Sequence, residues 1–169
     1  MATSTLLQSL NTDTDFGGVS TVGASNRRQV ETFIAKETLL VGDWVAFDYA
    51  ATADGDVTLG VFKADGNSTP VRTPMGVVLR GLDFDVDGVV DLSSGKRVEV
   101  VLSGVVDALT GDNGGAGMAI GALLQITNTA GQVDAASAAS AQPVCGILAE
   151  TVAAAAGAGI RRVVVRKSF

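Results

Sequence analysis

The sequence predicts an all-β fold: a compact β-barrel or β-sandwich built from two pseudo-repeated strand sets, with an extended N-terminal arm. Short apolar runs alternate with turn residues along the chain, a pattern typical of small β domains. The 21 glycines against 3 prolines fit frequent tight turns. Hydrophobic residues make up 47% of the chain but aromatic residues only 5%. Small and β-branched side chains of this kind suit closely packed sheets.

The same series of segments occurs twice, and this repeat is the strongest feature of the sequence. The first series consists of Gly42-Asp43-Trp44-Val45-Ala46-Phe47, Asp54-Gly55-Asp56-Val57, Pro74-Met75-Gly76-Val77-Val78-Leu79 and Arg97-Val98-Glu99-Val100-Val101. The second consists of Gly121-Ala122-Leu123-Leu124-Gln125-Ile126, Ala130-Gly131-Gln132-Val133, Pro143-Val144-Cys145-Gly146-Ile147-Leu148 and Arg162-Val163-Val164-Val165-Arg166. We expect the two halves to form one closed β unit from duplicated strands.

Alternating or continuous apolar runs mark the individual strands, and turn residues separate them. Asp54-Gly55 is a strong hairpin signal, and the glycine-rich segment 111–117 is expected to be a loop. Segment 135–141 is compatible with a single helical turn or a loop, and 151–156 is alanine-rich but too short for a stable helix. The expected strands are 28–34, 44–49, 58–63, 75–80, 88–92, 97–106, 122–127, 132–135, 144–149 and 160–166.

Residues 1–26 differ from the rest because they are rich in Ser and Thr and follow neither strand nor helix periodicity. We therefore divide the chain into an extended N-terminal arm, 1–26, and a single β-barrel or sandwich domain, 27–169. The arm is either a flexible terminus or a segment that becomes ordered on a neighbouring subunit. In the second case Leu6, Leu7 and Phe16 are its candidate anchors.

The net charge of −6 and the pI near 4.5 argue against nucleic-acid binding, which requires a basic surface. The chain has no long apolar run, and no basic segment precedes an apolar one at its start, so neither a membrane helix nor a secretory signal is expected. Basic residues gather at both ends of the predicted domain. They are either solvated strand ends or contacts with an acidic partner surface or the protein's own acidic loops across a subunit contact. These residues are Arg27, Arg28, Arg161, Arg162, Arg166 and Lys167.

No histidine and a single cysteine, Cys145, leave little scope for catalysis or metal binding. The absence of histidine removes the usual general base and the Ser-His and Cys-His nucleophile pairs. It also removes the commonest zinc ligand. Cys145 lies in an apolar run, so we expect a buried, inert thiol. We therefore predict no enzyme activity, no catalytic residues and no cofactor.

Asp83-Phe84-Asp85-Val86-Asp87-Gly88 matches the first half of a calcium-binding EF-hand loop. The match fails at the twelfth position, where Ser94 replaces the required glutamate, and no helical pattern flanks the loop. A solvated turn is the expected structure. A structural Ca²⁺ site and a two-carboxylate hydrolase remain as alternatives. The glycine-rich loop 111–117 lacks the Gly-Lys-Ser/Thr of a phosphate-binding loop.

The segments Gly-Asp-Trp-Val, Pro-Met-Gly-Val-Val and Val-Glu-Val-Val-Leu-Ser-Gly-Val-Val resemble the small capsid decoration (cement, head-stabilising) proteins of tailed bacteriophages. The second series resembles them as well, and the similarity covers residues 28–167. The resemblance implies a compact β domain that forms homo-oligomers, often trimers, on the outer surface of an icosahedral head. It also implies that the domain bridges major capsid subunits, and it supplies no catalytic residues.

We therefore expect a structural virion protein on the outer capsid surface, with the major capsid protein and its own copies as partners. The candidate contact residues are Leu6, Leu7, Phe16, Arg27 and Arg28. The main alternative is a phage tail or fibre-associated β module that binds a host glycan through exposed aromatics, for which Trp44 and Tyr49 are among the few candidates. No nucleic-acid, membrane or metal partner is expected.

Overall fold

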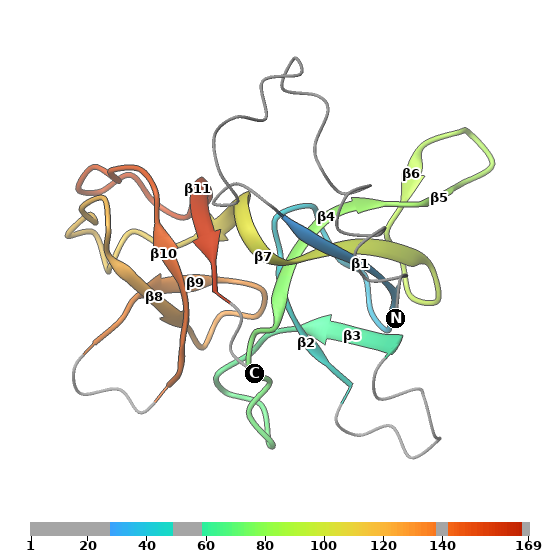
Figure 1. Cartoon of the computed structure of the whole chain (residues 1–169), viewed down its shortest axis with the longest axis horizontal. Helices are drawn as coiled ribbons and strands as arrows, with labels where there is room; N and C mark the ends of the chain where they lie inside the picture. Colours follow the sequence, from blue (N-terminus) through green and yellow to red (C-terminus); the bar gives the residue numbers. More distant parts are fainter. Residues whose placement is uncertain (1–27, 49–58, 138–141, 167–169) are drawn as a thin grey trace, which may run out of the picture.

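The computed structural model describes residues 28–48, 59–137 and 142–166, which form strands joined by turns and loops (Figure 1). The predicted all-β fold is confirmed. The strands are β1 (Gln29–Ala35), β2 (Trp44–Phe47), β3 (Gly60–Lys63), β4 (Gly76–Gly81), β5 (Asp83–Phe84), β6 (Val90–Asp91), β7 (Arg97–Thr110), β8 (Leu123–Ile126), β9 (Val133–Ala135), β10 (Val144–Leu148) and β11 (Gly159–Val165).

The first strand set closes into a five-stranded ring, in the order β1-β3-β2-β4-β7 and back to β1. Its neighbours are antiparallel except for β1 and β3, which run parallel where Ala35 pairs with Val61. We call this the first ring. Each of its strands has a neighbour on both sides, so none presents an unpaired edge.

The second strand set closes in the same way, in the order β7-β11-β10-β8-β9 and back to β7. Its neighbours are antiparallel except for β7 and β9, which run parallel where Thr110 pairs with Val133. We call this the second ring. The sequence predicts one closed unit, but the structure forms two rings that share β7 (Figure 1).

Backbone hydrogen bonds repeat between the two rings almost residue for residue. The Gly42 N–H donates to the Val78 carbonyl at 2.9 Å, and the Gly121 N–H donates to the Leu148 carbonyl at 2.8 Å. Both glycines have a positive φ, 93° and 86°, at the third position of a tight turn that enters β2 or β8. The repeat read from the sequence is therefore a repeat of backbone structure.

The shared strand β7 is 14 residues long and curves as it passes from the first ring to the second (Figure 1). Gly104 has a φ of 111°, a conformation that residues with a Cβ rarely adopt. Before this residue, side chains of β7 fill the first ring, and after it they fill the second. The inward side chains are Val98, Val100 and Leu102 on one side of Gly104 and Val106, Ala108 and Thr110 on the other. β7 continues four residues beyond the strand predicted at 97–106, and these residues pair with β11 in the second ring.

Two buried clusters fill the interior of the described residues. One lies inside the first ring and includes Phe33, Leu39 and Met75. The other fills the second ring and extends to the outer face of the first, where it includes Trp44. Trp44 is fully buried, so the two rings pack on each other as well as sharing a strand.

The other predicted strands differ from those in the structure by a few residues at their ends, and β5 was not predicted as a strand. Segment 111–117 is a loop, as predicted, and Val152 in the alanine-rich segment 151–156 forms a β-bridge with Met118. The last strand of each repeat aligns differently from the sequence match, because Arg97 occupies the position of Ile160 and not of Arg162. The hairpin turn predicted at Asp54-Gly55 lies outside the described residues.

Candidate functional site: an exposed hairpin on the first ring

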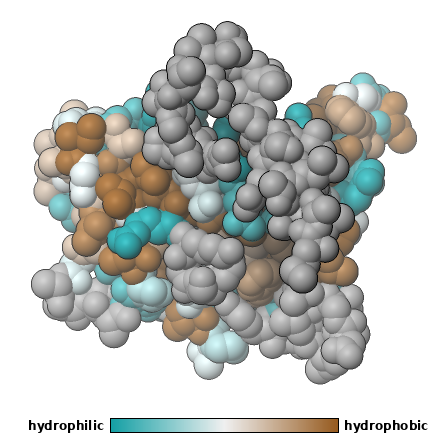
Figure 2. All heavy atoms as spheres, in the orientation of Figure 1, coloured by the Kyte–Doolittle hydropathy of each residue, from teal (hydrophilic) through white to brown (hydrophobic). Residues whose placement is uncertain are grey.

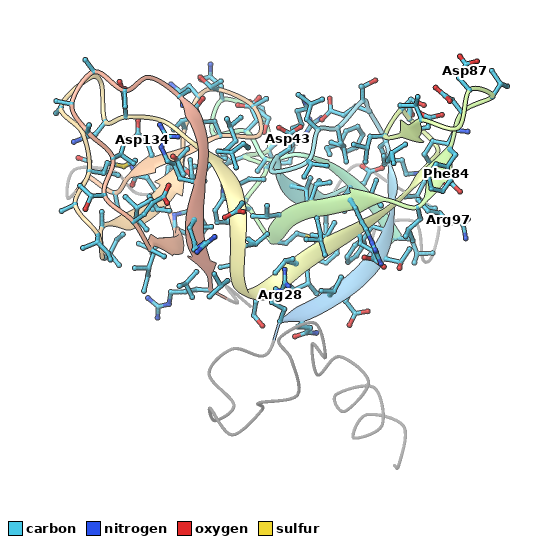
Figure 3. All side chains as sticks on the ribbon, turned by 90° about the horizontal axis from the view of Figure 1, so that it is seen from above. Arg28, Asp43, Phe84, Asp87, Arg97 and Asp134 are labelled. Carbon is cyan, nitrogen blue, oxygen red and sulfur yellow. The ribbon has the colours of Figure 1, made fainter. Side chains whose placement is uncertain are left out.

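The hairpin formed by β5 and β6 projects from the first ring and exposes large apolar side chains (Figures 1 and 3). Phe84 is 62% exposed, and Val86, Val89 and Val90 are also exposed. Apolar and polar residues alternate over this projection in the space-filling view (Figure 2). Groups of exposed large apolar side chains often mark interaction sites.

The carboxylate of Asp85 organises the hairpin turn. Its Oδ1 accepts hydrogen bonds from the backbone N–H groups of Asp87 and Val89, each at 2.9 Å. The backbone N–H of Asp85 also donates to the Val89 carbonyl at 2.8 Å, and Gly88 supplies a φ of 77°. A tight turn followed by a glycine in the left-handed region is a common three-residue hairpin connection. The turn predicted for this segment is therefore present.

An ion pair between Asp83 and Arg97 fixes the base of the hairpin to β7. Arg97 Nη2 donates to Asp83 Oδ1 at 2.8 Å, and the Arg97 backbone N–H donates to Asp83 Oδ2 at 2.7 Å. These hydrogen bonds from Arg97 lower the pKa of the Asp83 carboxyl below its ordinary value. The same contact raises the pKa of the Arg97 guanidinium. The hairpin therefore leaves the ring in a defined direction.

The returning strand is fixed at Asp91 and Leu92. Asp91 accepts a hydrogen bond from the Ser93 N–H at 2.9 Å and lies 3.3 Å from Lys96 Nζ. The hydrogen bonds from Ser93 are the main reason that the pKa of Asp91 is lowered. Leu92 packs against the core of the first ring. Gly81, the last residue of β4, allows β6 to approach, since a Cβ there would lie 2.6 Å from Val90 Cγ1.

The acidic residues of this segment are thus used to build the hairpin. Asp83 pairs with Arg97 at the base, and Asp85 accepts backbone hydrogen bonds in the turn, while Asp87 lies at the tip (Figure 3). In the described ranges, no three His, Cys, Asp or Glu side chains are placed to hold a metal ion. Asp83 lies opposite Asp91 across the two hairpin strands, and each carboxylate is engaged by a basic side chain, Arg97 or Lys96.

Of the contact residues predicted from the sequence, the structure describes one. Arg28 is partly buried and immediately precedes β1, beside the bend of β7, where Gln29 pairs with Ser103 (Figure 3). Arg166 follows Val165, which pairs with Gly104 on the other side of β7. The fold therefore brings Arg28 and Arg166 to the middle of the same strand. Leu6, Leu7, Phe16 and Arg27 lie outside the described residues.

Two further residues from the sequence analysis are buried. Trp44 has no exposed surface, so it does not provide an aromatic platform for a sugar. Tyr49 lies outside the described residues. Cys145 is buried in the second ring, and burial raises the pKa of its thiol to about 12. Its side chain is hydrogen-bonded to the Leu124 carbonyl at 3.4 Å, which agrees with the predicted inert thiol.

Sequence reasoning identified the aspartates of the hairpin but missed its exposed apolar residues. The run Asp-Phe-Asp-Val-Asp-Gly-Val-Val-Asp from 83 to 91 alternates acidic and apolar residues around an Asp-Gly turn. That pattern predicts a short hairpin with one apolar face. The strand expected at 88–92 corresponds to β6. Whether its valines are buried or exposed depends on how far the first ring extends, which the local sequence does not show.

Comparisons with known proteins return similarity to solved structures and none to a family model or a curated protein. The chain is similar to the solved N base of the head fiber gp8.5 of bacteriophage phi29, at 16% sequence identity and a TM-score of 0.47. The match covers 83% of this chain and 96% of that one. In the part of the chain described here, no helix is long and apolar enough to cross a membrane.

Proposed function

We propose that this protein is a structural virion component that binds the outer surface of a phage capsid and bridges major capsid subunits. The sequence pattern that resembles capsid decoration proteins supports this proposal. The structural observation that carries it is the hairpin Asp83–Asp91, with Phe84 and Val86 exposed on a body of closed rings. A protein of this shape would bind its partner through an exposed face or a projecting hairpin, and this function requires no catalytic pocket.

In this proposal the two rings are a rigid support and the hairpin is a capsid contact. The Asp83–Arg97 pair holds the hairpin in place before binding, which reduces the ordering cost at the interface. Burying a Phe or Val side chain contributes about 1.5–3 kcal/mol. Many subunits on one head act together, so modest individual contacts resist separation of the capsid under the pressure of packaged DNA.

The proposal also includes self-association, with a trimer as the expected oligomer, and a role for the N-terminal arm. The arm reaches adjacent subunits through Leu6, Leu7 and Phe16 and gains affinity by strand addition or by apolar anchoring. Arg27 and Arg28 lie where the arm joins the β domain, and they are candidates to contact acidic groups of the capsid or of a sister subunit.

Co-sedimentation with expanded capsids that lack this protein tests the hairpin. The Phe84→Ser/Val86→Ser variant should bind at least about tenfold more weakly than the unmodified chain, because two apolar anchors are lost. Val71→Ser is the matched control, since Val71 is exposed outside the hairpin. Circular dichroism establishes that each variant is folded. Equal binding by all three proteins would exclude the hairpin as a capsid contact.

A deletion of residues 2–20 tests the arm separately. We expect a folded, oligomeric β domain that binds capsids much more weakly, since the apolar anchors are removed while the rings stay intact. Undiminished binding by this truncated chain would place the capsid contact on the β domain alone. If neither the unmodified chain nor any variant binds capsids, the proposed function itself is wrong.

A further inference from the structure

Each ring carries a row of four apolar residues across its outer face. In the first ring the row runs across β1, β7, β4 and β2 through the cross-strand partners Val30, Val101, Val77 and Trp44. In the second ring it runs across β7, β11, β10 and β8 through Val105, Val164, Ile147 and Leu123. We call these the buried row and the open row.

The two rows occupy equivalent positions in the two rings. Each starts on the strand that closes its ring through a parallel pairing, and each then follows antiparallel ladders through strands in the same order. The hydrogen bonds of the two closing strands also match: the Lys36 N–H donates to Val61 at 2.9 Å, and the Gly111 N–H donates to Val133 at 2.8 Å. The open row is therefore the duplicate of the buried row.

The buried row is covered by the second ring. Trp44, Val77 and Val101 have no exposed surface, and they belong to the cluster that fills the second ring. The indole of Trp44 reaches Gly146 in β10, where a Cβ would lie 3.0 Å from its Cη2 atom. Within this chain, the apolar row on the outside of a ring is thus a packing surface for another ring.

The open row has no third ring to cover it in the described chain. Leu123 is 46% exposed, and Val105, Val164 and Ile147 remain partly exposed. In proteins built from repeats, a unit face that no neighbour covers is normally polar. The second ring instead keeps an apolar residue at every position of the open row.

An ion pair between β7 and β11 lies beside the open row. Next to Val105 and Val164 lies the pair Asp107 and Arg162, whose Oδ1 and Nε atoms are 3.5 Å apart. Beyond that pair, Leu109 faces Ile160, which is exposed. Apolar residues are prominent in the part of the surface that contains β8, β10 and β11 (Figure 2). A second subunit approaching this face meets an apolar surface in which opposite charges already balance.

We infer that the open row is the surface on which a second copy of this chain packs. Each strand of both rings has a neighbour on both sides, although β9 meets β7 only where Thr110 pairs with Val133, so little free strand edge is left and a face is the favoured contact. The internal packing of the two rings shows that this row is compatible with a β ring as its neighbour. The inference rests on the self-association in the proposed function, and it names the surface for it.

Thiol labelling in the absence of capsids tests the inference. Cys145 is buried with a raised thiol pKa, so an introduced cysteine is the reactive one. Leu123→Cys should react with a maleimide at least about tenfold more slowly at high than at low protein concentration, because mass action closes the interface. Val89→Cys, on the exposed hairpin, should react at the same rate at both. Equal rates at the two concentrations for Leu123→Cys would overturn the inference. Labelling of Leu123→Cys that is slow at every concentration, and becomes fast when residues 2–20 are deleted, would also overturn it.

Charge insertion gives a second measurement. Sedimentation equilibrium should show an oligomer for the unmodified chain and for Val89→Glu, and a monomer for Leu123→Glu at the same concentration. An oligomer for Leu123→Glu, or a monomer for the unmodified chain, would contradict the inference. If Leu123→Glu does not fold, the labelling of Leu123→Cys decides. Both measurements omit capsids, so their failure is distinct from a failure of capsid binding.

Discussion

The indole of Trp44 lies against Gly146, and this contact joins the two rings. Trp44 belongs to β2 of the first ring and Gly146 to β10 of the second, yet they share one buried cluster. A Cβ at position 146 would be 3.0 Å from Trp44 Cη2 and 3.0 Å from the Val164 carbonyl oxygen. Glycine is therefore required for close packing at this point, independently of any turn.

Gly146→Ala should lower the free energy of unfolding by about 1–3 kcal/mol, because an added methyl group overpacks a filled site. Chemical denaturation followed by circular dichroism measures the change. The Trp44→Phe/Gly146→Ala double variant should show a favourable coupling energy, since phenylalanine lacks the outer ring atoms that meet the methyl group. Strict additivity of the two single changes would show that the contact does not limit the packing.

Gly104→Ala should also destabilise the protein by about 1–3 kcal/mol, for a different reason. The φ of 111° at Gly104 is strained for a residue with a Cβ, and the bend of β7 depends on it. Ser103→Ala is the control, as it alters the neighbouring residue without this strain, and its effect should stay within about 0.5 kcal/mol. A Gly104→Ala variant as stable as the unmodified chain would mean that β7 bends without help from glycine.

The contact between Asp83 and Arg97 at the base of the hairpin should depend on pH. Hydrogen bonds from Arg97 lower the pKa of the Asp83 carboxyl. The contact is therefore fully formed at a pH above the ordinary aspartate pKa of about 3.9. The contact is lost as the pH falls through the lowered pKa, when the carboxyl becomes protonated. The NMR shift of the Arg97 amide, which donates to Asp83 Oδ2, should follow this titration. In Asp83→Asn that acid transition should be absent, and its persistence would assign it to another group.

Cys145 should be unreactive in the folded protein. With a pKa of about 12, its thiolate is roughly a thousandfold rarer at pH 8 than that of an ordinary cysteine. A disulfide reagent should therefore modify it only as the chain unfolds, and the modification rate should follow the unfolding rate in denaturant. Rapid reaction under native conditions would show that the second ring opens locally around β10.

The sequence by itself determined the all-β class, the repeat and most strand positions. These follow from local properties: alternation of apolar residues, glycine at tight turns, and the match between the segments that enter β2 and β8. The turn around Asp85 was also readable, because the Asp-Gly pair at 87–88 and the Asp side chain favour it locally.

Only the tertiary structure decided how the two repeats are joined and which apolar residues stay outside. Trp44 and Leu123 occupy equivalent positions, yet one is fully buried and the other 46% exposed. No local pattern distinguishes them, because burial depends on whether another ring packs on that face. Ring closure depends likewise on pairing between distant segments, such as Thr110 with Val133, and on the bend at Gly104. Such long-range contacts are properties of the assembled fold, and the local sequence around each residue does not contain them.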